Sequence, residues 1–257
     1  MRPHTSGRRT AISALAATAV ALALVAGGSV AAQARTAPLT LGALTRKLDA
    51  AVLAKGSVRF VHSTVVAGSA TNTSTGTVKW VKGFGSLAMT QASGPTRLRL
   101  ISLPGADYSF DRTGGGRWIR FREGGRGPTA TSFSGDLQLM RQRVNPARLL
   151  PGLSALAVTP AGSKVVAHVR CSVYTVALTG AQLFATQPAA TRPAPDALVG
   201  STAVVTFYLD SRGLPVEVTE VIRGSFGAYA EITTFTRWGA AATVSRPTGK
   251  IIDDPAG

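Results

Sequence analysis

The chain has 257 residues, with 28 Lys and Arg against 12 Asp and Glu and a formal net charge of +16. Its single cysteine, Cys171, excludes an intrachain disulfide, so an exported domain of this length must be stabilised by its hydrophobic core. Cys171 lies in a strand-like run and is expected to be a small buried side chain, the alternative being a reactive thiol. The positive charge favours anionic partners.

The first 34 residues have the pattern of an export signal. Arg2, Arg8 and Arg9 precede an apolar stretch over residues 11–26, and Ala32-Gln-Ala34 fits the small-x-small rule for cleavage. We predict cleavage near Ala34 and a secreted, extracytoplasmic protein, exported by the general secretory route or the twin-arginine route. A retained membrane anchor is the alternative. Loss of three arginines lowers the formal charge from +16 to +13, and no cysteine follows the signal to accept a lipid.

A helix and then a series of strands are expected in the first half of the remaining chain. Thr40 is a suitable N-cap for a helix that ends at Lys55, with Gly56 as the stop signal. Its apolar stripe consists of Leu41, Leu44, Leu48 and Val52. From Val58 to Phe121, apolar and polar residues alternate in runs separated by turn signals every 10–12 residues or so, which predicts an antiparallel sheet with short connections.

The middle of the chain changes from alternating to helical patterns. Ser134 can cap a helix with Leu137, Met140 and Val144 on one face, and Asn145-Pro146 has the N-cap and N1 residues of a second, short helix. Strands are expected again over residues 164–179. The Pro- and Ala-rich residues 187–196 have no periodicity and are expected to form an exposed loop.

The last third contains the clearest local signal. The runs 202–210 and 215–223 are rich in β-branched and aromatic residues and flank a short turn, which predicts a β-hairpin, and a third strand follows over 226–238. We predict a single domain over residues 35–245, after the signal at 1–34, and a polar tail over 246–257.

No catalytic motif stands out. Gly83-Phe-Gly85 lies between two strands, which argues against a dinucleotide site, and Ser154 lacks the last glycine of a nucleophile elbow. His62 and His168 leave a hydrolase open as an alternative, although strand histidines are usually structural. Asp107 and Asp111 are better explained as ion-pair partners than as a glycosidase pair. We expect no enzyme activity, no cofactor, no metal site and no nucleic-acid partner.

Several features together resemble a known family. These are the first helix, the long meander, the Asn145-Pro-Ala-Arg-Leu-Leu150 helix start, the Tyr208-Leu-Asp-Ser-Arg-Gly-Leu-Pro215 turn and the Ile232-Thr-Thr-Phe-Thr-Arg-Trp-Gly239 ending. Over residues 38–245 the chain resembles the actinobacterial LppX/LprG-type proteins of the LolA-like superfamily. The resemblance implies an α+β fold in which a strongly curved antiparallel sheet, an incomplete barrel, carries helices on its concave face. It also implies burial of lipid acyl chains between sheet and helices, although relatives are often lipoproteins and this chain has no lipid-accepting cysteine.

The residues and the resemblance together favour a secreted, non-enzymatic carrier of a hydrophobic, lipid-like ligand, with a ligand-free envelope sensor or protein-interaction module as the alternative. An anionic envelope surface and a membrane-protein partner are further expectations. Basic residues at the rim are expected to meet an anionic headgroup: Arg97, Arg99 and Arg120. The expected hydrophobic lining, with an ordinary filled core as its alternative, consists of Val58, Phe60, Val78, Trp80, Leu98, Leu100, Leu137, Met140, Leu149, Leu150, Phe207 and Ile232.

Overall fold

The computed structural model describes residues 39–254, except 67, 82–83, 113–114, 123–127, 194–197 and 226. The predicted export signal therefore lies outside the described residues. Residues 38–257 form one compact unit. Among the described residues, no helix has both the length and the apolar character needed to cross a membrane.

The first helix, α1 (Leu41–Lys55), has the boundaries that the sequence predicts. The Thr40 side chain accepts a hydrogen bond from the Ala43 amide, and Gly56 ends the helix in the left-handed conformation with φ of 69°. The predicted stripe of Leu41, Leu44, Leu48 and Val52 is buried, because this face of the helix packs on the sheet.

Twelve strands form one sheet in the described part of the chain, in the order β12-β6-β5-β4-β3-β2-β1-β11-β10-β9-β8-β7. All neighbours pair antiparallel except β12 and β6, which run parallel, and β7 and β12 stand at the two edges. The sheet is therefore not closed into a barrel. The strands are β1 (Ser57–Val66), β2 (Ser69–Val81), β3 (Phe84–Ser93), β4 (Thr96–Leu103), β5 (Ala106–Asp111), β6 (Arg117–Arg122), β7 (Thr159–Val166), β8 (Val169–Thr179), β9 (Thr202–Leu209), β10 (Pro215–Gly224), β11 (Gly227–Thr236) and β12 (Ile251–Asp253).

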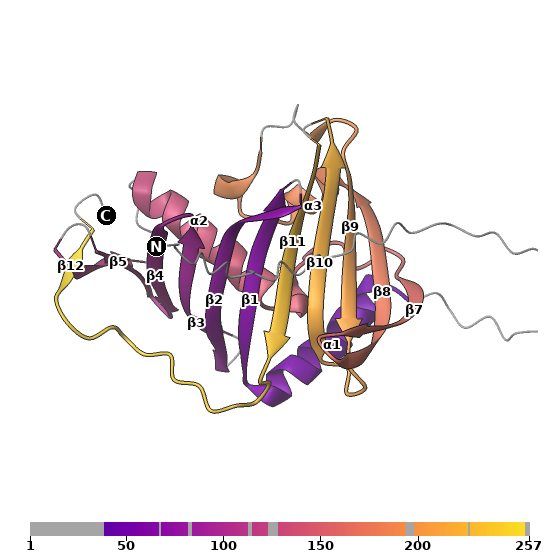
Figure 1. The fold of residues 1–257 in the computed structure, drawn as a ribbon, viewed down its shortest axis with the longest axis horizontal. Helices are drawn as coiled ribbons and strands as arrows, with labels where there is room; N and C mark the ends of the chain where they lie inside the picture. The colour runs from indigo at the N-terminus through magenta and orange to yellow at the C-terminus, as the bar shows by residue number, and fades with distance from the viewer. Residues whose placement is uncertain are drawn as a thin grey trace, which may run out of the picture. The chain divides into compact units, whose positions relative to one another are not determined.

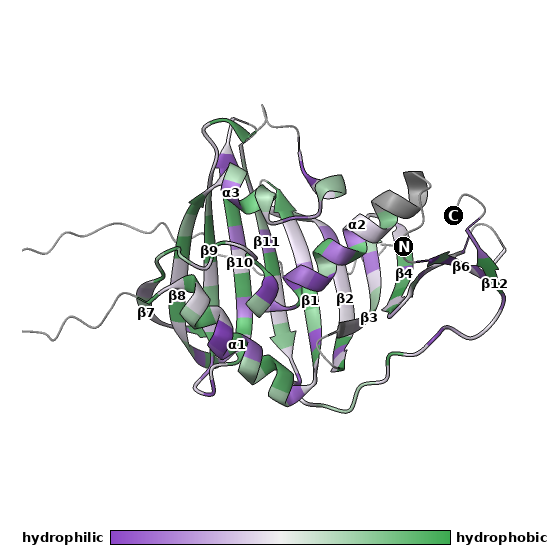
Figure 2. Cartoon of the chain, turned by 180° about the vertical axis from the view of Figure 1, so that it is seen from behind, coloured by the Kyte–Doolittle hydropathy of each residue, from purple (hydrophilic) through white to green (hydrophobic). Residues whose placement is uncertain are grey.

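The helices lie on one face of this sheet, and the sheet bends around them (Figures 1 and 2). The remaining helical elements are α2 (Pro128–Arg143), η1 (Pro146–Arg148), α3 (Gly180–Ala185) and η2 (Ala189–Thr191). Asn145 caps η1 through its side chain, with Pro146 at the first helical position, as predicted. This arrangement confirms the expected fold class, a curved antiparallel sheet with helices on its concave face.

Five features differ from the sequence prediction. The expected exposed loop over residues 187–196 contains the short helix η2, and its Gln187 is buried. Helix α2 begins at Pro128 rather than at Ser134. Helix α3 was not predicted, although Thr179 and Gln182 form a capping box at its start. His168 lies at the β7–β8 turn with φ of 65°, not inside a strand. The expected polar tail contributes β12, because the backbone of Ile251–Asp253 pairs with the edge strand β6, so the sheet extends past residue 245.

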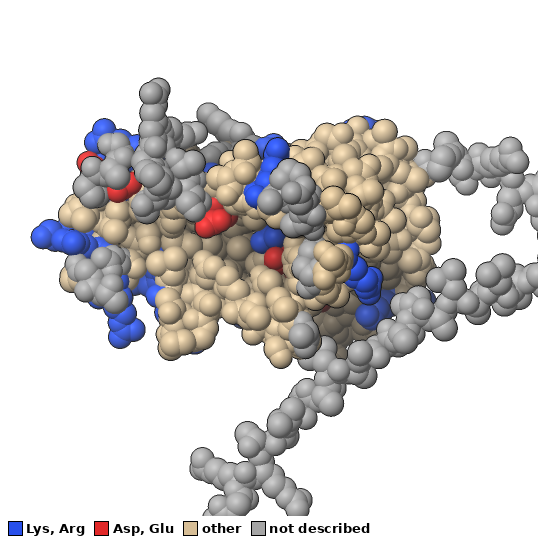
Figure 3. Space-filling model, turned by 90° about the horizontal axis from the view of Figure 1, so that it is seen from above, with Lys and Arg blue, Asp and Glu red and all other residues tan. Residues whose placement is uncertain are grey.

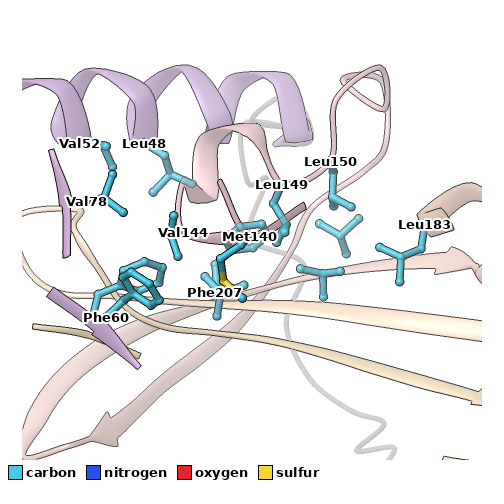
Figure 4. Close-up of a cluster of buried hydrophobic side chains, with 14 of the residues drawn as sticks. Leu48, Val52, Phe60, Val78, Met140, Val144, Leu149, Leu150, Leu183 and Phe207 are labelled. Atoms are coloured by element: carbon cyan, nitrogen blue, oxygen red, sulfur yellow. The ribbon is translucent and has the colours of Figure 1, made fainter. Parts of the chain in front are cut away.

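The hydrophobic core lies between the concave face and the helices. Figure 4 shows Leu48 and Val52 of α1 directed towards Val78 and Val144, with Phe60 and Phe207 below them. Phe207 is fully buried. The ring of Phe60 lies where a side chain on Gly76 would stand, since a Cβ on that glycine would come within 2.8 Å of the ring. Much of the interior is thus filled by the protein's own side chains.

Candidate functional site

Helix α2 separates two cavities on the concave side of the sheet. Its apolar side chains Leu137 and Met140 are buried against the core, which fixes the helix on the sheet. The polar side chains on one flank line a larger cavity of about 570 Å³, and those on the other flank line a smaller cavity of about 300 Å³.

The larger cavity has an apolar floor and a polar wall. Val78 and Trp80 of β2 belong to the floor, and Gln138 and Arg141 of α2 belong to the wall. The full lining is Val78, Trp80, Gly85, Leu103, Gly105, Ala106, Asp107, Ser134, Gln138, Arg141, Gln142, Val144, Asn145, Arg148 and Pro151. An apolar floor beside polar groups suits an amphiphile, whose two parts need different surroundings.

A hydrogen-bond chain fixes part of the polar wall. Arg141 Nη1 donates to Ser102 Oγ at 2.9 Å, and Ser102 Oγ donates to Asp107 Oδ1 at 2.6 Å. Ser102 and Asp107 are buried, whereas Arg148 is exposed at the edge of the cavity. Arg141 is thus held against the sheet, and Arg148 adds a second positive charge from η1.

Two sequence features named above, the hairpin turn before Pro215 and the ending that contains Trp238, support the floor of the larger cavity. The rings of Trp80 and Trp238 stack with centroids 5.9 Å apart, and Trp238 Nε1 donates to the Pro215 carbonyl at 2.9 Å. Asp210 Oδ1 accepts from the amides of Arg212 and Leu214 in the turn before Pro215. The hairpin turn thus holds Trp238, and Trp238 in turn packs against Trp80.

The smaller cavity is more polar than the larger one. It is lined by strands β1 to β4 and by α2, through His62, Thr64, Asn72, Ser74, Met89, Gln91, Leu98, Leu100, Phe133, Asp136, Leu137, Leu139, Met140 and Arg143. Strand register explains the polar side, since His62 pairs with Ser74, and Ser74 pairs with Gln91. Paired residues point to the same face of a sheet, so the three side chains form a row on the concave face.

A buried ionic cluster adjoins this row. His62 Nε2 lies 2.9 Å from Glu231 Oε2, and Arg143 Nη2 lies 3.2 Å from Glu231 Oε1. Thr64 Oγ1 donates to Glu231 Oε2 at 2.9 Å. His62 Nδ1 lies 2.9 Å from Thr233 Oγ1. Arg143 therefore fastens the end of α2 to β11 through a buried carboxylate.

Burial sets the ionisation states in this cluster. It lowers the pKa of His62 despite the hydrogen bond to Glu231, so the neutral ring donates from Nε2 to Glu231 and accepts at Nδ1 from Thr233. Burial alone would raise the pKa of Glu231, but the hydrogen bond from His62 and the charge of Arg143 bring it below its usual range. Burial raises the pKa of the neighbouring Glu220 to about 7, because the charge of Arg143 opposes this effect only in part.

The predicted lining residues, Ile232 excepted, lie in three places: the larger cavity, the smaller cavity and the filled core. Val78 and Trp80 line the larger cavity, and Leu98, Leu100, Leu137 and Met140 line the smaller one. Five others are core side chains that line neither cavity: Val58, Phe60, Leu149, Leu150 and Phe207. The prediction is wrong for Ile232. This residue pairs with Ser63 and Thr219 on the convex face of the sheet, whereas its neighbours Glu231 and Thr233 point to the concave face.

The three predicted headgroup arginines line neither cavity. Arg97 is exposed and donates to the carbonyls of Gly94 and Thr96. Arg99 lies over the rings of Phe110 and Trp118 at 5.3 Å from each centroid, and Arg120 pairs with Asp253. In Figure 3, Lys and Arg side chains are scattered over the face seen from above and do not form one continuous patch. The arginines beside the larger cavity are Arg141 and Arg148.

Sequence reasoning missed the polar row and the ionic cluster. The signal was present in the alternation, because the positions that share a face with Phe60 and Phe235 continue as His62 and Thr64, and as Thr233 and Glu231. Following each alternating set to its end, rather than its apolar members alone, would have predicted a partly polar concave face. Among the described residues, no group of three or more His, Cys, Asp or Glu side chains is placed to hold a metal ion.

Comparison with solved structures identifies proteins of similar fold. LprF from Mycobacterium bovis aligns with a TM-score of 0.51 and 14% identity over 80% of this chain and 97% of that one. The Mycobacterium tuberculosis lipoprotein LppX aligns with a TM-score of 0.47 and 13% identity over 80% of this chain and 98% of that one. No family model and no curated protein sequence matches the chain. The likeness to LprF shows a shared fold, as the resemblance described above led us to expect.

Proposed function

We propose that this protein is an extracytoplasmic, non-enzymatic carrier that binds an amphiphile with an apolar chain in the larger cavity. The observation that carries the proposal is the cavity of about 570 Å³ with an apolar floor and an arginine-containing wall. Its volume falls within the range of roughly 300–1,000 Å³ that is usual for small-molecule sites. The fold shared with LprF is compatible with this function, because the resemblance described above implies burial of acyl chains between sheet and helices.

The apolar floor supplies the affinity in this proposal. Each methylene that leaves water for the surface around Val78 and Trp80 contributes about 0.8 kcal/mol. Arg141 and Arg148 supply the preference for an acidic headgroup, because a guanidinium forms charge-assisted hydrogen bonds with a carboxylate or a phosphate. One amphiphile would thus place its ionic headgroup at the edge of the cavity and its apolar chain on the floor.

Filling the cavity tests the proposal. Gln138→Trp places an indole in the larger cavity from an exposed position on α2, so it should abolish uptake of a fluorescent fatty acid without lowering the melting temperature. Leu53→Trp is the matched control, because Leu53 is 41% exposed on α1 and lines neither cavity. Uptake that survives Gln138→Trp, together with purified wild-type protein that carries no lipid in native mass spectrometry, would contradict the proposal.

Reversing one charge tests the headgroup preference. Arg148→Glu should weaken binding of a fatty acid about tenfold and leave binding of the corresponding fatty alcohol unchanged, because the alcohol has no charge to repel. Arg97→Glu makes the same change at an exposed site away from both cavities and should affect neither ligand. Equal losses for acid and alcohol would mean that Arg148 acts through packing rather than through charge.

A further inference from the structure

The smaller cavity gathers buried polar atoms that lack a protein hydrogen-bond partner. Within the described residues six side-chain atoms are in this state, and three of them, Ser74 Oγ, Asn72 Oδ1 and Arg143 Nε, belong to residues that line this one cavity. Ser74 is only 1% exposed. An unpaired buried polar group destabilises a fold, so three around one space indicate a site that a polar guest would complete.

The groups of the neighbouring cluster are directed at one another rather than at these atoms. Both ring nitrogens of His62 are engaged, with Glu231 and with Thr233. Glu231 Oε2 is engaged with His62 and Thr64, and its Oε1 with Arg143. Ser74 lies directly across the strand pair from His62, yet the His62 ring is turned towards β11. Ser74 and Asn72 can therefore find hydrogen-bond partners in the cavity rather than on the neighbouring strand.

The chemistry of the three atoms restricts the guest. Asn72 Oδ1 only accepts, Arg143 Nε only donates, and a serine hydroxyl does both, so the guest must offer donors as well as acceptors. A hydroxyl group offers both. Charge argues for a neutral guest, because the lining contains one carboxylate, Asp136, and one guanidinium, Arg143, so an anion and a cation would each meet a like charge.

We propose that the smaller cavity binds a neutral, hydroxyl-rich group, either a free sugar or the sugar portion of an amphiphile. The rest of the lining fits such a group, since the apolar side chains Leu98, Leu100 and Met140 can cover the C–H faces of a sugar ring while the polar row meets its hydroxyls. The volume of about 300 Å³ is at the lower end of the usual range for ligand sites. The site is separate from the larger cavity and does not depend on the function proposed for it.

Titration of the purified protein with methyl glucoside, with octyl glucoside below its micellar concentration and with octanoate tests this assignment. We expect saturable binding of a glucoside, seen by calorimetry and by shifts of the amide signals around Ser74 in β1 to β3. Binding of methyl glucoside identifies a free sugar as sufficient, and binding of octyl glucoside alone shows that the sugar is recognised as part of an amphiphile. If neither glucoside binds, or if octanoate binds at these strands as well as they do, the cavity is occupied by water or by chains and the proposal is overturned.

Ser74→Ala removes one of the proposed contacts. It should lower the affinity for the glucoside about tenfold, and Ser69→Ala, an exposed position on the same strand, should leave it unchanged. In the absence of ligand, Ser74→Ala should not lower the melting temperature, because the lost hydroxyl has no protein partner. Equal affinity of Ser74→Ala and wild type would overturn the assignment. Gln138→Trp should retain glucoside binding, which separates a failure of this site from a failure of the larger one.

Discussion

The concave face of the sheet has an apolar region across β8 and β9 and a polar region that begins at β10 and β11. Across β8 and β9, the paired inward residues Val176 and Val205 are apolar and fully buried. The same row continues through Glu220 of β10 and Glu231 of β11. The apolar region is closed by the protein's own side chains, whereas the polar region lies under α2 beside the smaller cavity. Alternation thus determines which side chains face inward, and their chemistry determines whether the interior is filled.

A large-to-small substitution in each region gives the largest expected contrast. Phe207→Ala should lower the free energy of unfolding by about 3–5 kcal/mol, because the fully buried ring leaves a hole that closely packed neighbours cannot fill. Phe133→Ala on α2, a half-buried ring beside the smaller cavity, should cost less than half as much. Urea unfolding of the two variants measures both losses. Equal losses of unfolding free energy would show that the region beside the smaller cavity is packed as tightly as the apolar region around Phe207.

The buried carboxylate of the polar region should matter nearly as much at neutral pH. Glu231→Gln removes the charge between His62 and Arg143 and should cost about 3 kcal/mol at pH 7, because Arg143 loses its buried counter-ion. The folded pKa of Glu231 lies below its unfolded value, so its ionisation stabilises the fold above that value, and this contribution is lost as the pH falls through the folded pKa. The difference from wild type should therefore shrink below about pH 4.

A control on the other face of the sheet separates this effect from the loss of any glutamate. Glu217→Gln changes a half-buried residue of β10 that pairs with Tyr208. Burial raises the pKa of Glu217, so this change should be neutral or slightly stabilising at pH 7, opposite in sign to Glu231→Gln. Chemical denaturation of both variants at pH 7 and at pH 3.5 or so provides the comparison. A Glu231→Gln protein as stable as Glu217→Gln at pH 7 would mean that the cluster contributes no net stability.

The sequence was sufficient for the parts of the fold that depend on local patterns. The stripe and caps of α1, the hairpin before Pro215 and the Asn145 cap are each specified by neighbours along the chain. Helix α3 and strand β12 were missed because six and three residues carry little periodicity, and β12 forms only where β6 offers an edge. Strand β12 therefore depends on a tertiary contact, whereas α3 has a local signal in the Thr179–Gln182 capping box.

The candidate site was less predictable for a related reason. Which residues line a cavity depends on where α2 lies, and no pattern within residues 128–143 specifies that position on the sheet. The arginines that reach the larger cavity, Arg141 and Arg148, come from the helical segment rather than from the strands. The polar row, by contrast, is visible once strand register is known, because His62, Ser74 and Gln91 are in register across β1, β2 and β3.

The effect that depends most strongly on pH is expected at the boundary of the two regions. Glu220 pairs with apolar Val205 on one side and with Glu231 on the other, and burial raises its pKa to about 7. The folded state therefore holds a proton that the unfolded state releases above about pH 4.5, so stability falls as the pH rises from there towards pH 7 and beyond. Glu220→Gln should be near neutral at pH 5 and should stabilise the protein at pH 8 by up to about 3 kcal/mol. Unfolding measured across this pH range should thus give a profile opposite in sign to that of Glu231→Gln, and a flat difference from wild type would show that Glu220 is solvated rather than enclosed by its apolar neighbours.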